Sequence, residues 1–233
     1  MNDSVFTQLL DLACGAFLLA AVAVLWLRQL TSIVRAFAFQ GVALAAVAAL
    51  LGLREGRGEL LAVAAGVGLL RAGALPHLMR RVLAASRPGD GGGRYEEDVS
   101  EARETRPLVN VAASLLSAAL LTFLAYAVAR PLVALDPTPA TRALPVALAV
   151  VLIGFFTLVT RRRALAQVVG FLLLDNGITA TAFLAASGVP LIVELGVSFD
   201  VLLAVLVLQI LTTRMRAAFG GTGIDDLREL RDR

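Results

Sequence analysis

The chain has 233 residues, of which 58% are hydrophobic and only 17% are charged, with a formal net charge of +3. A soluble domain of this size could not bury so much apolar surface. The composition therefore excludes a soluble protein and indicates an integral membrane protein. The alternating pattern of a membrane β-barrel is absent, so we expect an all-α polytopic fold. The small positive charge is not a nucleic-acid signal and bears on membrane topology instead.

Seven stretches reach the length of about 20 apolar residues that a membrane-spanning helix needs. In chain order they are Val5–Leu27, Ser32–Leu53, Leu60–Leu83, Leu108–Ala129, Ala143–Thr160, Ala164–Ser187 and Pro190–Thr213. The amino terminus carries Asp3 and Asp11 and has no cation before Arg28. A cleavable signal peptide begins with a positive region, so we expect the first helix to be retained.

The arginines are distributed unevenly between the two sides of the membrane. All 21 basic residues are arginines. One side of the membrane receives the first, third and fifth connections and the tail, and these segments carry most of the arginines. The other side carries four, Arg54, Arg57, Arg130 and Arg142, and Arg71 lies within a predicted span. Arginine-rich connections stay in the cytoplasm. We therefore expect the amino terminus outside and the carboxyl terminus in the cytoplasm.

The sequence divides into five segments. Residues 1–86 form a three-helix membrane unit, 87–106 a Gly-rich, charged cytoplasmic linker, 107–142 a connecting transmembrane helix and outer loop, 143–214 a second three-helix unit, and 215–233 a cytoplasmic tail.

The two three-helix units share a pattern. Each has a basic link after its first helix and a polar residue before a glycine in its second: Gln40-Gly41 and Asn176-Gly177, 136 residues apart. Four crossings separate their starts, so both units would point the same way, as in parallel repeats. Tandem duplication and chance resemblance of apolar helices both remain open at this point.

Three charged residues lie near the middle of predicted spans. An ionised Asp at that depth costs several kcal/mol unless it is paired, hydrated or protonated, which makes Asp175 and Asp200 candidates for a proton pathway. The alternative for each is a structural hydrogen bond. Arg71 keeps its proton, so it can bias or pair with an acid but cannot carry a proton. A purely structural ion pair is its alternative role.

Two further titratable residues are weaker candidates for the same pathway. Glu194 follows Pro190 by four residues, near the outer interface, where it either reaches water or exchanges protons. His77, the one histidine, lies towards the cytoplasm and can titrate near neutral pH, or is simply interfacial. A lone Cys14 and a lone histidine offer no metal centre, and no cofactor motif is present.

The last three predicted helices resemble a known family. The segments that carry the resemblance are Arg161-Arg162-Arg163, the stretch from Gly170 to Ile178 around Asp175, and the stretch from Glu194 to Leu202 around Asp200. This pattern is similar to the three-helix K-type subunit of complex I and of multisubunit cation/proton antiporters. Over nearly its full length the chain resembles the hydrogenase-4 component E family, a membrane-arm subunit of group 4 nickel–iron hydrogenases and formate hydrogenlyase. The K-type glutamate after the glycine is replaced here by Leu172, and Asp175 lies one turn further on.

The resemblance implies a non-catalytic subunit in a bacterial or archaeal cytoplasmic membrane. Its partners would be antiporter-like and H-type membrane subunits and peripheral redox subunits, and the latter would hold the nickel–iron and iron–sulfur centres. The proton-pathway residues would be Asp175, Asp200, Glu194, Arg71 and His77. The alternatives are a structural scaffold of that arm, a subunit of a cation/proton antiporter, and a stand-alone transporter. Coupling to sodium instead of protons also stays open.

Overall fold

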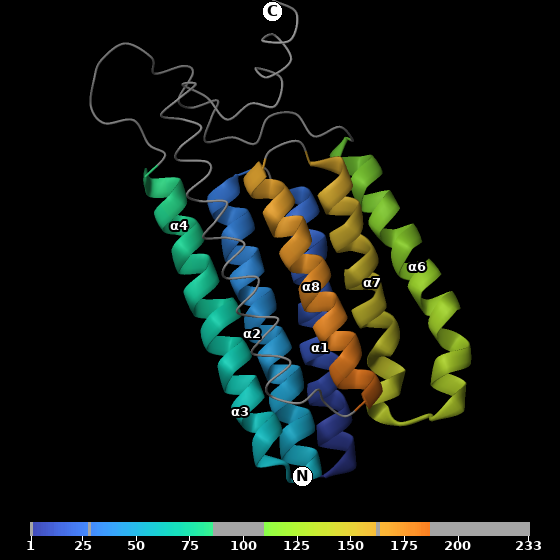
Figure 1. Ribbon diagram of the computed structural model, residues 1–233. Coiled ribbons are helices and arrows are strands. Elements are labelled where there is room, and N and C mark those ends of the chain that lie inside the picture. Colours follow the sequence, from blue (N-terminus) through green and yellow to red (C-terminus); the bar gives the residue numbers. More distant parts are fainter. Residues whose placement is uncertain (1, 28, 86–109, 162–163, 187–233) are drawn as a thin grey trace, which may run out of the picture.

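The computed structural model describes residues 2–27, 29–85, 110–161 and 164–186. Every element in these ranges is helical (Figure 1). The elements are α1 (Asp3–Trp26), α2 (Leu30–Glu55), α3 (Gly58–Val67), the π-helical turn η1 (Gly68–Ala74), α4 (Leu75–Ala85), α6 (Val111–Leu135), α7 (Pro139–Thr160) and α8 (Ala164–Ala186). Because α3, η1 and α4 follow one another without a break, they form one span.

The described residues thus form six spans, each long and apolar enough to cross a membrane, which confirms the expected all-α polytopic class. The seventh predicted span, Pro190–Thr213, lies outside the described residues, as do the 87–106 linker and the 215–233 tail. The end where the chain begins lies opposite the ends of α4 and α7 (Figure 1).

The fifth predicted span is longer than expected, because it begins at Pro139 and not at Ala143. The Thr138 hydroxyl oxygen accepts a hydrogen bond from the Thr141 backbone N–H at 3.2 Å, and the Thr141 hydroxyl oxygen accepts from the Thr138 N–H at 2.9 Å. This reciprocal cap satisfies two orphan donors and starts the helix four residues early. The fourth span is also longer, since α6 continues through Pro131 to Leu135.

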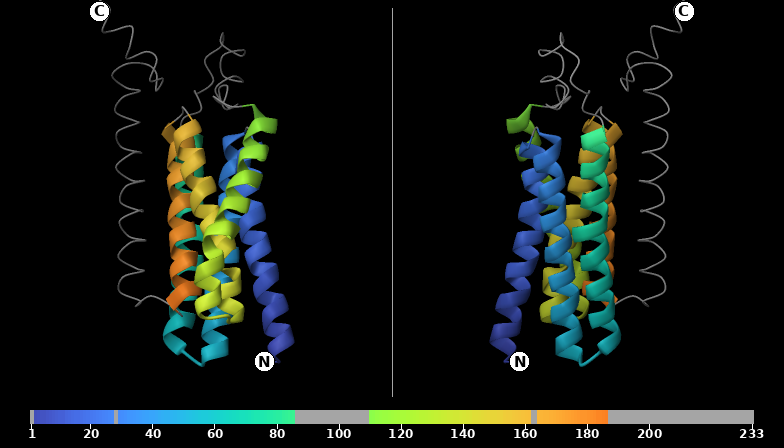
Figure 2. Two further views of the ribbon diagram at one scale, coloured as in Figure 1. Left: turned by 90° about the vertical axis from the view of Figure 1, so that its right-hand side faces the viewer. Right: turned by 90° about the vertical axis from the view of Figure 1, so that its left-hand side faces the viewer.

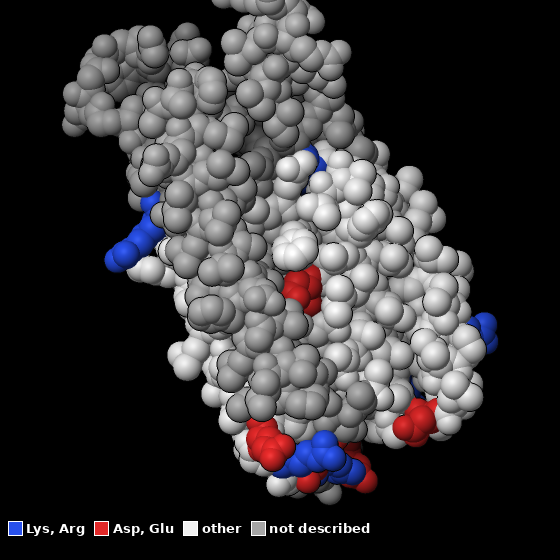
Figure 3. Space-filling view, viewed as in Figure 1, with Lys and Arg blue, Asp and Glu red and all other residues white. Residues whose placement is uncertain are grey.

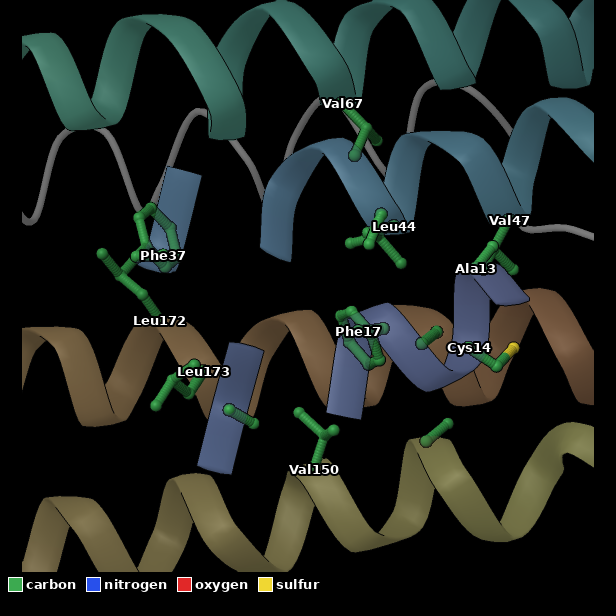
Figure 4. Close-up of a cluster of buried hydrophobic side chains, with 14 of the residues drawn as sticks. Ala13, Cys14, Phe17, Phe37, Leu44, Val47, Val67, Val150, Leu172 and Leu173 are labelled. Carbon is green, nitrogen blue, oxygen red and sulfur yellow. The ribbon is translucent and has the colours of Figure 1, made fainter. Parts of the chain in front are cut away.

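Two helical hairpins form the centre of the bundle. One hairpin is α1 with α2 and the other is α7 with α8; α1 packs on α7, and α2 packs on α8. The third span packs on α2, and α6 packs on α7 at the opposite edge (Figures 1 and 2). The buried hydrophobic cluster takes side chains from all six spans and includes Cys14. Figure 4 shows members from α1, α2, α3, α7 and α8.

Glycines set the spacing between α7 and α8. A Cβ added at Gly170 would lie 2.6 Å from the backbone nitrogen of Leu158, and one added at Gly177 would lie 2.6 Å from that of Val151. Small residues let helix backbones approach closely inside a membrane, where dispersion contacts replace the hydrophobic effect as the main attraction. The α7–α8 hairpin is therefore closed along its length by backbone-to-backbone contact, which fixes the orientation of α8.

Arg161 ties the two hairpins together at the end of the bundle where α1 and α7 finish. Its guanidinium donates through Nη2 to the backbone oxygens of Val24 at 3.0 Å and Leu25 at 3.2 Å, in the last turn of α1. A cation there satisfies carbonyls that have no partner within the helix. Burial lowers the pKa of the Arg161 guanidinium from its ordinary value, but an arginine still keeps its proton at neutral pH.

We expect Gly170→Ala to lower the free energy of unfolding by about 1–3 kcal/mol, because the added methyl forces α7 and α8 apart. Thermal unfolding in detergent measures the change. Gly15→Ala is the matched control: Gly15 is exposed on α1 and a Cβ there meets nothing within 4 Å. Equal melting temperatures for the Gly170 variant and the wild type would contradict the account of α7–α8 packing.

We also expect Arg161→Gln to destabilise the bundle by about 1.5–3 kcal/mol, because it removes charge-assisted hydrogen bonds to α1. The exposed Arg35→Gln, a like loss of charge on α2, should cost no more than about 0.5 kcal/mol. The comparison uses the same unfolding assay. Similar losses in the two variants would show that Arg161 acts only through net charge.

Candidate functional site: a buried arginine cluster

Arg71 lies in a π-helical turn in the middle of the third span. The turn, η1, is followed by Pro76, which has no N–H and cannot donate to the preceding turn. Such π turns interrupt α-helices at few places, often at functional sites. The turn places the Arg71 side chain inside the bundle, where its exposed fraction is 1%.

A glycine on α2 makes room for this turn. A Cβ added at Gly41 would lie 2.8 Å from the carbonyl carbon of Arg71 and 2.9 Å from the nitrogen of Ala72. Because a side chain cannot occupy that space, Gly41 allows the backbone of η1 to rest directly on α2. The close approach fixes the position of the Arg71 backbone, and therefore which side chains its guanidinium can reach.

Three side chains on two successive turns of α8 bind the Arg71 guanidinium. Nη2 lies 2.8 Å from Asp175 Oδ2 and donates to Thr179 Oγ1 at 3.0 Å, while Nη1 donates to Asn176 Oδ1 at 2.6 Å. Residues three and four apart lie on one face of a helix, so α8 presents all three oxygens to the same place. A buried charge is tolerated when it is paired and hydrogen-bonded in this way.

A fourth side chain extends the cluster onto α2. The amide nitrogen Nδ2 of Asn176 donates to Oε1 of Gln40 at 2.8 Å. Gln40 is fully buried, and Asn176 has an exposed fraction of 1%. The cluster therefore joins the third span, α2 and α8 through polar contacts in the middle of an apolar bundle.

The two members of the ion pair differ in their access to the surface. The side chain of Asp175 is 13% exposed, whereas that of Arg71 is 1% exposed. Elsewhere on the face shown in Figure 3, charged side chains gather mainly at the end where the chain begins. Asp175 is therefore the member of the pair that a proton or a neighbouring group can approach.

The structure joins two of the sequence-predicted residues and places a third, His77, away from them. Arg71 and Asp175 form the ion pair. His77 is exposed on α4 and contributes none of the contacts described above. Asp200 and Glu194 lie outside the described residues. Among the described residues, no three His, Cys, Asp or Glu side chains lie close enough to hold a metal ion.

Sequence reasoning missed the roles of Asn176, Thr179 and Gln40. Both Asn176 and Thr179 bind the Arg71 cation, a contact that the sequence analysis does not predict. The available signals were the shared polar-glycine pairs of the second and sixth spans and the four-residue spacing of Asp175 and Thr179. Both signals place these polar groups on helix faces, but neither predicts whether the groups on those faces bind an acid or a cation.

Comparison with known proteins identifies relatives of the chain. No family model matches the sequence, and no solved structure matches it. The chain is 48% identical over 232 residues to the uncharacterized protein Rv0085 of Mycobacterium tuberculosis, covering 100% of both chains. Over 116 residues it is 32% identical to hydrogenase-4 component E of Escherichia coli K12, which covers 50% of this chain and 54% of that protein. The Shigella flexneri protein of the same name gives the same values.

A double-mutant cycle tests the ion pair. We expect Arg71→Met to lower the free energy of unfolding by about 3–5 kcal/mol, because it leaves the Asp175 carboxylate without its counter-ion. Adding Asp175→Leu should recover part of this loss, with a coupling of about 0.5–3 kcal/mol. Thermal or denaturant unfolding in detergent provides the values.

The control for this cycle is the ion pair of Arg54 with Asp3 at the surface. An exposed pair contributes no more than about 1 kcal/mol, so Arg54→Met should have a small effect. Additive losses for the Arg71 and Asp175 variants would contradict a buried pair that acts as a unit.

Proposed function

The chain belongs to the same family as the Mycobacterium tuberculosis protein Rv0085, and we propose that it is an integral membrane subunit of an energy-converting redox complex that translocates protons. Redox chemistry would take place in peripheral partner subunits that hold nickel–iron and iron–sulfur centres. This chain would contribute a buried acid, Asp175, to the proton pathway of the membrane arm.

Two observations support this proposal. The first is the 32% identity to hydrogenase-4 component E over half of the chain, since that protein is by name a component of a hydrogenase. The second, which carries the proposal, is the Arg71–Asp175 pair in the middle of the bundle. Ionisable groups at this depth are costly and mark ion and proton pathways more often than packing sites.

The contacts of Arg71 favour Asp175 as the group that exchanges a proton. Arginine keeps its proton, so proton transfer in the pair has to use the carboxylate. If Asp175 takes up a proton, its pairing with Arg71 weakens, but the guanidinium keeps the neutral oxygens of Asn176 and Thr179. When the charge of the cluster changes by one unit, the guanidinium therefore keeps two neutral hydrogen-bond acceptors.

The remainder of the path follows from the sequence. Asp200 and Glu194 in the next predicted span would pass protons towards the outside, and His77 would admit them from the cytoplasm. On the bias of arginines, the amino terminus would lie outside and the carboxyl terminus in the cytoplasm. Membrane-arm subunits of the antiporter-like and H-type would be the neighbours of this chain.

The density of contacts around Arg71 favours one alternative function. All three α8 oxygens bind the guanidinium, and Arg71 is 1% exposed, so the cluster also suits a rigid scaffold without proton transfer. A scaffold needs the pair for assembly only. The two functions therefore differ in what happens when the charge of Asp175 is removed while its shape is kept.

We expect Asp175→Asn in the native host to leave the complex assembled and to abolish most of its proton translocation, because an amide cannot take up and release the proton. Acidification by inverted membrane vesicles, together with recovery of the complex in mild detergent, measures both properties. Asp136→Asn, which neutralises an exposed acid between α6 and α7, is the matched control and should pump normally.

Two outcomes would reject the proton role. Normal pumping by an assembled Asp175→Asn complex would leave the carboxylate without a role in proton transfer. Failure of that variant to assemble, with the control intact, would favour the scaffold. The co-purified proteins test the setting: a nickel–iron enzyme supports the redox complex, whereas antiporter subunits alone would redirect the proposal to a cation/proton antiporter.

A further inference from the structure

The polar contacts of the cluster form a chain of hydrogen bonds that runs in one direction. Arg71 donates to the oxygen of Asn176, and the nitrogen of Asn176 donates to the oxygen of Gln40. Each amide accepts on the side of the guanidinium and donates on the side away from it. The series ends at Nε2 of Gln40, a donor without a hydrogen-bond acceptor among the described residues.

Rotating the amides does not remove this unmet donor. Arg71 only donates, so the oxygen of Asn176 has to face it and the nitrogen of Asn176 has to face Gln40. Rotating the Gln40 amide would then bring two nitrogen donors together and lose the 2.8 Å hydrogen bond. A guanidinium at one end thus fixes the orientation of both amides.

A donor left unsatisfied at this position is costly. Gln40 has an exposed fraction of 0%, and a buried N–H without an acceptor costs about 1–3 kcal/mol. Buried polar groups of this kind are usually satisfied by an ordered water molecule. The ion pair already balances the charge of Arg71, so a neutral acceptor suits the end of the chain better than an anion.

We propose that Nε2 of Gln40 binds a water molecule inside the bundle, between α2 and α8. The neighbouring turns have small side chains: Ala43 lies one turn from Gln40 on α2, and Ala180 lies one turn from Asn176 on α8; both are buried. The site follows from hydrogen-bond geometry and does not depend on the proton role proposed above.

The functional meaning of this site is internal hydration. A water molecule at Gln40 lies at the far end of the amide series from the Arg71–Asp175 pair. It adds a polar molecule to the cluster, on the side of Asn176 away from the Asp175 carboxylate. Two amides, which do not take up and release protons, lie between this water and the Arg71–Asp175 pair, so the water completes the hydrogen bonding of the bundle whether or not the proton role holds.

Nuclear magnetic resonance of the full chain in lipid nanodiscs tests the site. The sequence holds five glutamines, at 8, 29, 40, 167 and 209, so side-chain ¹⁵N-glutamine labelling gives few signals. Gln40→Asn assigns the Gln40 amide by the loss of its signal. Transfer of magnetisation from water to each amide is then measured in the wild type, with the exposed Gln8 as the positive control.

We expect a water cross peak at the Gln40 side-chain amide, comparable to that of Gln8 in the same sample. The opposite result is an amide without a water cross peak whose deuterium exchange is as slow as that of the backbone N–H of Leu44, a fully buried neighbour on α2. That result would mean that a protein group satisfies the donor, and it would overturn the proposal whether or not Asp175 carries protons.

Discussion

The positive charge of Arg71, held in the middle of an apolar bundle, is the constraint on which the arrangement of the other helices depends. A buried cation needs a counter-ion and several acceptors, and among the described residues one face of α8 supplies three such oxygens. The π turn and Gly41 bring the guanidinium to that face, and the glycines of α7 and α8 hold the face in position. The cluster thus links the third span and α2, which are consecutive, to α8, which is distant from both in sequence.

Two contacts support the hypothesis that the chain contains two related three-helix units. The sequence pattern aligns the units at an offset of 136 residues, and Gln40 and Asn176, which this offset makes equivalent, bond to each other. Arg161 and Leu25, also 136 apart, bond at the cytoplasmic end predicted from charge. Residues that contact their own equivalents are expected near an axis along the membrane normal that relates parallel repeats. The acid of Asp175 has no counterpart in the first unit, where Phe39 occupies that place, so the two units differ in charge.

The sequence predicts the six described spans, and it selects Arg71 and Asp175, because charge in an apolar stretch is a strong signal. It misses the early start of α7, since a Thr-Thr cap looks like loop composition. It also misses the roles of Asn176, Thr179 and Gln40. Whether an amide at mid-membrane bonds an acid, a cation or another amide depends on which helix faces it, and apolar helices contain little information about their neighbours. The π turn has no sequence mark beyond Pro76 and three nearby glycines.

The charge state of Asp175 in a lipid bilayer tests the central claim most directly. Infrared spectra of protein with ¹³C-labelled aspartate carboxyls, recorded in nanodiscs for the wild type and Asp175→Asn, isolate the signal of this side chain by difference. The account predicts an ionised carboxylate at neutral pH in the wild type and a neutral acid once Arg71 is replaced by Met. A neutral acid beside an intact Arg71, or a carboxylate unaffected by the loss of Arg71, would contradict it.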